Sequence, residues 1–86
     1  MLYLCGDKTL GPVGLQYAQM DPDAKVVLIK DGVYLDIEGV HDKKIYAIDE
    51  DVNRRGMADR LEGKADIIGY AELVDLIFEN KVVNFV

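Results

Sequence analysis

Two runs of four consecutive hydrophobic residues, 26–29 and 45–48, place the strongest constraint on how this chain folds. They read Val-Val-Leu-Ile and Ile-Tyr-Ala-Ile. A strand without polar positions is typically buried on both faces, as an inner strand of a parallel sheet covered by helices is. The two runs therefore predict adjacent or near-adjacent central strands of an α/β fold.

The rest of the chain alternates between strand-like and helix-like patterns. Helices between consecutive strands favour right-handed crossovers and hence a parallel sheet. We therefore predict one domain, residues 1–86, with a five-stranded, mostly parallel sheet and helices on both of its faces. The other strands are expected at residues 2–5, 65–68 and 82–86, and the helices at 12–22, within 33–37, after Asp49 and across 72–79.

The segment that follows the second hydrophobic run begins with three consecutive carboxylates. Asp49 is placed to be the N-cap of a helix, with Glu50 and Asp51 in its positive first turn. Pairing of Glu50 with Arg54, and of Asp51 with Arg55, would support that helix at i,i+4 spacing. Capping explains all three acids, so we favour it over a metal cluster, and we expect neither a metal nor a cofactor.

The last helix is predicted to be amphipathic. Its expected buried stripe lies opposite its acidic side chains. The stripe consists of Leu73, Val74, Ile77 and Phe78, and the acidic side of Glu72, Asp75 and Glu79.

The net charge and the length of the chain limit the kinds of molecule that it is expected to bind. The net charge of −6 opposes binding to a nucleic-acid backbone, and no segment is apolar for the ~18 residues that a membrane span needs. The N-terminal apolar run is also too short for a signal peptide, so we expect a cytoplasmic protein. A domain of 86 residues has little core to spare. We therefore expect a homo-oligomer, in the first instance a dimer, and the spare apolar residues that could form its interface are Tyr34, Leu35, Ile37 and Leu76.

Cys5 is the single cysteine and the one candidate sulfur nucleophile. At the carboxyl end of a first parallel strand it would lie where open α/β sheets place their ligands, and a following helix could lower the pKa of its thiol. The alternative is a small hydrophobic residue that completes a buried strand, which is the common situation of a free cysteine. We favour the second interpretation. The glycines after Cys5 lack the spacing of either a phosphate loop or a dinucleotide fingerprint.

Three segments in order resemble the DsrH/TusB family. Residues 26–34 are similar to its "LLLI-x-DGVY" stretch, and 45–57 to "VYAL-x-EDL-x-ARGL". Residues 68–85 resemble "I-x-Y-x-x-FVDL…V-x-SW", with Phe85 in place of the terminal tryptophan.

The resemblance implies a DsrEFH-like, three-layer α/β/α fold and a role in sulfur trafficking. Family members sit in hetero-oligomers that pass persulfide sulfur between cysteines, toward 2-thiouridine at the tRNA wobble position or in sulfur oxidation. The main sulfur-carrying cysteine belongs to a sister subunit of the DsrE or DsrF type (TusC- or TusD-like). The leading expectation is an accessory, non-catalytic subunit, not an enzyme by itself. The alternatives are a persulfide carrier that uses Cys5, and a homodimeric binding or regulatory module that has lost the relay role.

Overall fold

The sheet predicted from the hydrophobic runs is present, and all of its strand pairs are parallel. A computed structural model describes residues 1–40 and 42–86. His41, which the neighbouring Asp42, Lys43 and Lys44 predict to be a solvated loop residue, therefore lies outside the described residues. The strands are β1 (Leu2–Cys5), β2 (Lys25–Leu28), β3 (Lys44–Ile48), β4 (Asp66–Ile68) and β5 (Val82–Phe85). They form a five-stranded sheet in the order β4-β3-β2-β1-β5. The two hydrophobic runs are neighbours in it, as predicted.

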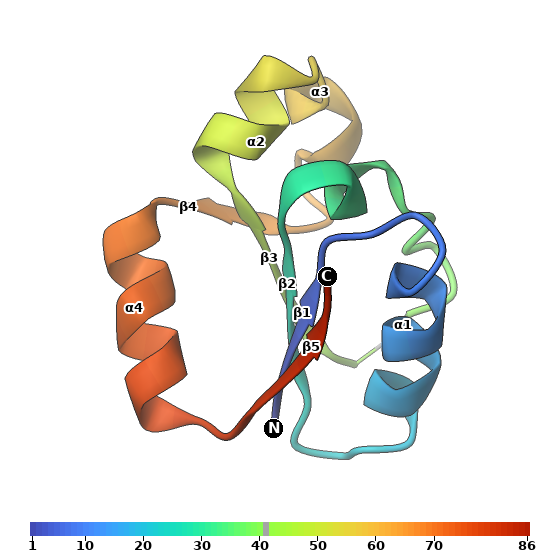
Figure 1. Cartoon of the computed structure of the whole chain (residues 1–86). Coiled ribbons are helices and arrows are strands. Elements are labelled where there is room, and N and C mark those ends of the chain that lie inside the picture. Colours follow the sequence, from blue (N-terminus) through green and yellow to red (C-terminus); the bar gives the residue numbers. More distant parts are fainter. Residues whose placement is uncertain (41) are drawn as a thin grey trace.

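Helices cover both faces of this sheet, which gives three layers (Figure 1). One face is covered by α1 (Gly11–Gln19), and the other by α4 (Tyr70–Glu79). The short helices η1 (Lys30–Tyr34), α2 (Asp49–Arg54) and α3 (Ala58–Leu61) gather at the end where the strands finish. The α/β fold class is therefore confirmed, with a sheet that is parallel throughout the described residues.

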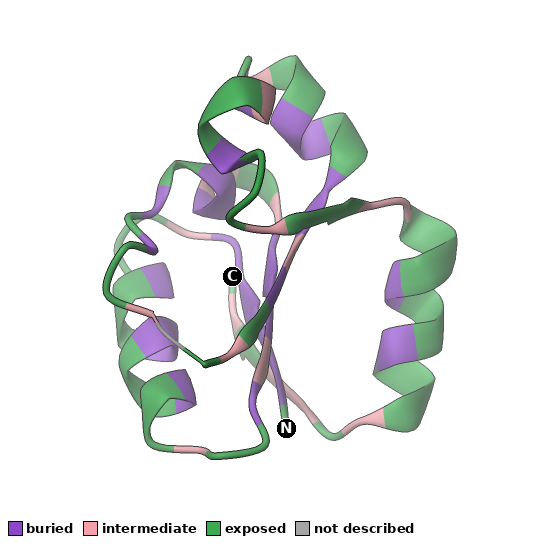
Figure 2. Cartoon of the chain, turned by 180° about the vertical axis from the view of Figure 1, so that it is seen from behind, coloured by how far each residue is buried: buried purple, intermediate pink, exposed green. Residues whose placement is uncertain are grey.

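Successive side chains of each strand point to opposite faces of the sheet, so the core is divided into two clusters. Cys5 and Leu28 belong to the cluster under α1, whereas Leu4 and Val27 belong to the cluster under α4. The α1 cluster is the larger because η1, α2 and α3 also contribute to it. Figure 2 shows that the buried side of α4 faces the sheet and that the rest of this helix is exposed.

Three expectations about the helices need correction. The helical turn expected within 33–37 is a 3₁₀ helix at Lys30–Tyr34, which begins directly after β2. Asp49 is the first residue of α2 and not its N-cap; its carboxylate instead accepts the N–H of Glu50. On α4 the buried residues are Leu73 and Leu76, while Val74, Ile77 and Phe78 of the expected stripe are exposed.

Candidate functional site

The carboxyl edge of the sheet, where α/β folds bind their ligands, is closed around Cys5. Cys5 is the last residue of β1 and its side chain is fully buried. A methyl group on Gly14 of α1 would lie 2.9 Å from its Sγ, so the helix backbone packs directly on the sulfur. On the other side, a Cβ on Gly32 of η1 would lie 1.7 Å from the Cys5 carbonyl oxygen. Because Gly14 and Gly32 have no side chain, the backbones of α1 and η1 can both pack directly against Cys5.

Burial dominates the chemistry of the Cys5 thiol. Removal from water disfavours the charged thiolate and raises the thiol pKa to about 12, from an ordinary value of 9.0. Burial therefore outweighs any lowering of the thiol pKa by the amino end of the following helix. The first backbone N–H groups before α1 are in any case occupied, because the Asp7 carboxylate accepts those of Thr9 and Leu10 at 2.7 and 2.8 Å. At neutral pH, Cys5 is a protonated thiol without access to solvent.

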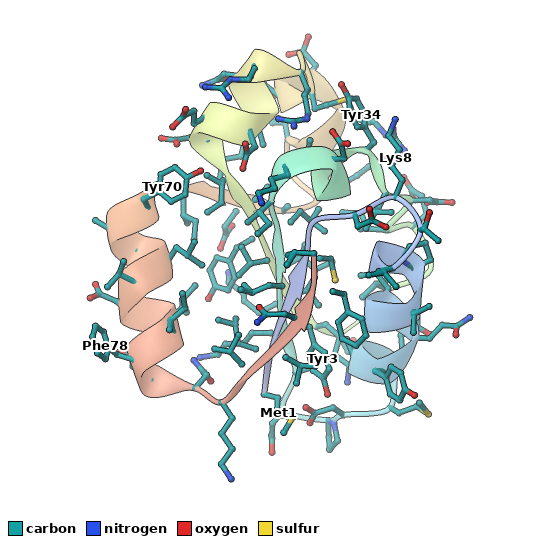
Figure 3. The ribbon with its side chains drawn as sticks, viewed as in Figure 1. Met1, Tyr3, Lys8, Tyr34, Tyr70 and Phe78 are labelled. Carbon is teal, nitrogen blue, oxygen red and sulfur yellow. The ribbon has the colours of Figure 1, made fainter. Side chains whose placement is uncertain are left out.

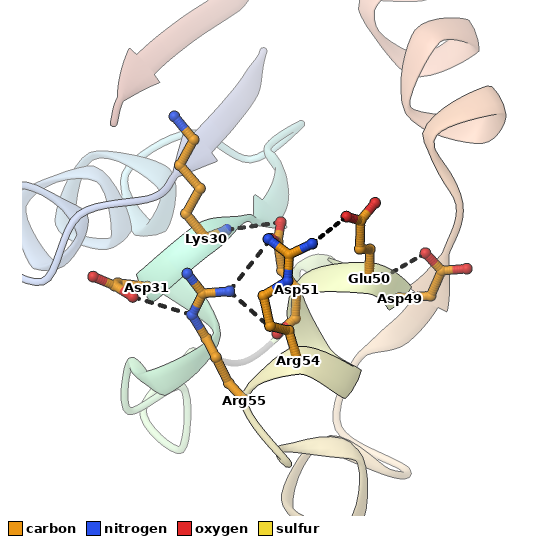
Figure 4. A network of polar contacts seen from close by, with 7 residues as sticks. All are labelled: Lys30, Asp31, Asp49, Glu50, Asp51, Arg54 and Arg55. Carbon is orange, nitrogen blue, oxygen red and sulfur yellow. Dashed lines mark hydrogen bonds and ion pairs between the residues drawn. The ribbon is translucent and has the colours of Figure 1, made fainter.

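A buried carboxylate fixes the neighbouring part of this edge (Figure 4). Asp51 is 5% exposed and accepts the backbone N–H of Lys30 at 2.9 Å. Its other oxygen accepts from Arg55 at 3.4 Å, and the same guanidinium binds Asp31 at 3.1 Å. Lys30 has a φ of 50°, a left-handed conformation that is unfavourable for a residue with a side chain. The hydrogen bond from the backbone N–H of Lys30 to the Asp51 carboxylate stabilises this turn and connects η1 to α2.

Both predicted ion pairs of α2 are present, with different surroundings. The bond from Arg54 to Glu50 is 2.6 Å long and lies in solvent. The pair of Arg55 with Asp51 is partly buried and reaches across to η1 through Asp31. The sequence indicated the i,i+4 spacing, but it gave no signal that Asp51 would be buried and would bind a backbone 21 positions away.

Most of the expected interface residues are core residues. Leu35, Ile37 and Leu76 are 7–9% exposed and belong to the two core clusters. Leu35 packs on the first residue of α1, since a Cβ on Gly11 would lie 2.5 Å from its Cδ1. Tyr34 is exposed, and Lys8 lies over its ring with the ammonium 5.0 Å from the centroid (Figure 3). The four side chains do not form one exposed patch.

A hollow lies away from Cys5, at the amino ends of β3 and β4. It has a volume of about 220 Å³, and its charged lining residues are Lys43, Lys44, Lys64 and Asp66. Lys44 pairs with Asp66, and Lys64 with Glu38 of the adjoining loop. Among the described residues no group of three or more metal-binding side chains comes together. No helix in the described part of the chain is long and apolar enough to cross a membrane.

Comparison with known proteins agrees with this architecture. The family model described as "DsrH like protein" matches residues 14–83. This chain belongs to the DsrH-like family. Because family members work within sulfur-relay complexes, membership implies the role of a relay subunit.

A solved structure resembles this DsrH-like chain over nearly its whole length. It is the solution NMR structure of protein Tm0979 from Thermotoga maritima, with 30% sequence identity and a TM-score of 0.69. The match covers 94% of this chain and 95% of that one. None of the curated proteins compared with the chain matches it.

Proposed function

We propose that this chain is an accessory, non-catalytic subunit of a cytoplasmic sulfur-relay complex. One observation carries the proposal: the single cysteine of this DsrH-like chain is enclosed and has a thiol pKa of about 12. Sulfur transfer needs a thiolate that can reach the sulfane sulfur of a donor and displace the donor's thiolate. Cys5 meets neither requirement, so the persulfide cysteine of the relay belongs to a sister subunit.

The partners that fit this role are DsrE- and DsrF-like (TusC- and TusD-like) subunits, together with further copies of this chain. The acidic charge disfavours direct binding of RNA by the chain itself. In 2-thiolation of the tRNA wobble uridine, as in sulfur oxidation, the chain would have a structural role in the complex, and the sister subunits would carry out the sulfur transfer. A free, buried cysteine that needs no oxidant suits the reducing cytoplasm.

The test is persulfide loading of the isolated, folded chain. With a cysteine desulfurase and L-cysteine as donor at neutral pH, we expect no gain of a sulfur atom on Cys5 in intact-mass measurements. After unfolding, the same thiol should react with a maleimide within the dead time of ordinary mixing. Rapid persulfide formation on the folded chain would overturn the accessory role in favour of the carrier.

A second experiment separates the accessory subunit from a binding module without a relay role. Sister subunits encoded beside this chain would be co-expressed with it, and sulfur transfer through the purified complex would be measured with wild-type chain and with Cys5→Ala. We expect a stable complex and equal transfer by both. A chain that forms no complex with DsrE- and DsrF-like neighbours would instead be the homodimeric binding or regulatory module.

A further inference from the structure

Strand β5 is an outer strand of the sheet, and the outer edge of its backbone is unpaired. It ends the strand order and pairs with β1 along its inner edge. The carbonyl of Phe85 accepts the N–H of Gly6, so it points inward, and the backbone groups of alternate residues in a strand point to opposite sides. The N–H groups of Val82, Asn84 and Val86 therefore point outward. Among the described residues, none of these three groups has a hydrogen-bond partner.

The two edges of the sheet differ in how well they are protected. Natural proteins keep edge strands from pairing with other chains by shortness, charge or proline. The strand at the other edge, β4, has three residues and includes Asp66, which pairs with Lys44. Residues 82–86 contain neither a charged residue nor a proline. The β5 edge is therefore open to a further strand.

The side of α1 that borders this edge is exposed and apolar. We call its exposed apolar side chains the α1 stripe, and they are Leu10, Val13, Tyr17 and Met20. Their spacing of three and four residues places them within about 80° of one another around the helix axis. The Tyr17 ring stacks on Phe85 of β5 with centroids 5.9 Å apart, so the α1 stripe adjoins the β5 edge (Figure 1).

The segments that form this surface lack charge. Residues 10–20 and 82–86 include no Asp, Glu, Lys or Arg, although these types make up 30% of the chain. The solvent side of a surface helix normally carries charged and polar residues. Exposed apolar side chains beside unpaired backbone groups are instead typical of a surface that another chain covers. When a strand is added to a sheet, main-chain hydrogen bonds supply the affinity and alternate side chains supply the specificity.

We propose that the β5 edge and the α1 stripe receive an extended segment of a different protein, which joins the sheet as a further strand. The inference rests on the proposed function, which supplies the partner, a sister subunit of the relay complex. Alternate side chains of the segment meet the α1 stripe and are apolar, while those between them lie on the face of the exposed Asn84 and are polar. A second copy of this chain would bring another net charge of −6 to the contact, which a less acidic subunit would not.

Amide hydrogen exchange tests the edge directly. In the isolated chain, the outward amides of Val82, Asn84 and Val86 should exchange much faster than those of Val83 and Phe85, which bond to β1. In a complex with purified sister subunits encoded beside this chain, the outward amides should become protected at least ~10-fold. Outward amides that stay unprotected in a stable complex would overturn strand addition and leave the accessory role standing. Protection that rises with the concentration of the isolated chain would assign the edge to a second copy and overturn the choice of partner.

Substitutions on the strand and on the helix test the same surface. Asn84→Pro removes an outward N–H but no bond to β1, and it should weaken the complex at least ~10-fold. Asn84→Thr keeps the N–H and should bind within about twofold of wild type. Val13→Glu places a charge on the α1 stripe and should also weaken binding at least ~10-fold. Gln19→Glu adds the same charge on the other side of α1, where Gln19 reaches Gly39, and should change binding no more than about twofold.

Binding would be measured by titration calorimetry, and thermal unfolding would check that each variant folds. If Asn84→Pro does not fold, Val13→Glu and the exchange of the outward amides decide the matter. Folded variants at Asn84 and Val13 that bind like wild type would overturn the choice of surface. A wild-type chain that binds no sister subunit would overturn the proposed function together with this inference, whereas a complex that forms without protecting the β5 edge overturns the inference alone.

Discussion

The two faces of the sheet are packed to different extents. Under α1, with η1, α2 and α3 at its end, the apolar side chains are buried and two glycines bring backbones into contact with Cys5. Under α4, a single helix covers the sheet and keeps an exposed apolar flank. The comparison indicates that the α1 face supplies most of the stability and encloses the thiol, whereas α4 is attached to the sheet by a smaller buried cluster.

The closest backbone contact on the α1 face, between Gly32 and Cys5, predicts the largest loss of stability. In Gly32→Ala the new methyl would lie 1.7 Å from the Cys5 carbonyl oxygen, and backbone atoms on both sides cannot move apart cheaply. We expect a loss of about 4 kcal/mol or more in the free energy of unfolding, or no folded protein at all. Gly39→Ala is the matched control, because nothing lies within 4 Å of its added Cβ. Urea denaturation that finds the two variants equally stable would refute the close packing at Cys5.

Truncation of large side chains tests the contrast between the two faces directly. Leu28 is fully buried under α1, and Leu28→Ala should cost about 3 kcal/mol. Phe78 is a larger side chain but is 85% exposed, so Phe78→Ala should cost no more than about 0.5 kcal/mol in the monomer. Urea denaturation of both variants would measure the two costs. A comparable cost at both positions would mean that Phe78 is buried in the folded chain.

The contacts of Asp51 at the carboxyl edge of the sheet predict an intermediate loss of stability. Asp51→Asn keeps the size of the side chain but removes the charge that binds Arg55 and the backbone of Lys30. We expect a loss of about 2 kcal/mol, because hydrogen bonds of a charged, buried group are stronger than neutral ones. Glu50→Gln breaks the exposed pair with Arg54 and should cost less than about 0.5 kcal/mol. Equal losses in urea denaturation would show that burial of Asp51 has no energetic consequence.

The strands could be predicted from the sequence because their signal is local. An uninterrupted run such as 26–29 specifies burial on both faces without any knowledge of its neighbours. The preference for a buried Cys5 had a similar basis, since the residue completes a short apolar strand that ends at Gly6. The enclosure by Gly14 and Gly32 could not be foreseen, because it depends on contacts between distant segments.

The orientation of α4 could not be predicted for a different reason. Apolar residues occupy well over half of its circumference, so the sequence allows more than one buried stripe. The sheet buries Leu73 and Leu76 and leaves Val74, Ile77 and Phe78 exposed. Likewise, Leu35 and Ile37 looked like spare surface residues because the space that they fill exists only once α1 is packed.

The smallest expected effect is a dependence of stability on alkaline pH that comes from Cys5. The thiol pKa is about 12 in the folded protein, against an ordinary value of 9.0 that applies once the chain unfolds. Between these values the folded state holds a proton that the unfolded state releases, so stability falls as pH rises. The contribution is fully present below pH 9.0 and is lost progressively as pH rises toward about 12, by at most ~1.4 kcal/mol per pH unit.

Cys5→Ala isolates this contribution, because tyrosines and lysines titrate in the same range in both proteins. The free energy of unfolding would be measured at intervals from pH 8 to pH 10.5, and the difference between wild type and variant plotted against pH. With a thiol buried as described, the wild type should lose roughly 1.4 kcal/mol more than Cys5→Ala by pH 10. A difference that stays constant over the range would mean that the folded and unfolded thiols titrate alike. Cys5 would then be accessible as a thiolate, and the persulfide-carrier alternative would regain its main requirement.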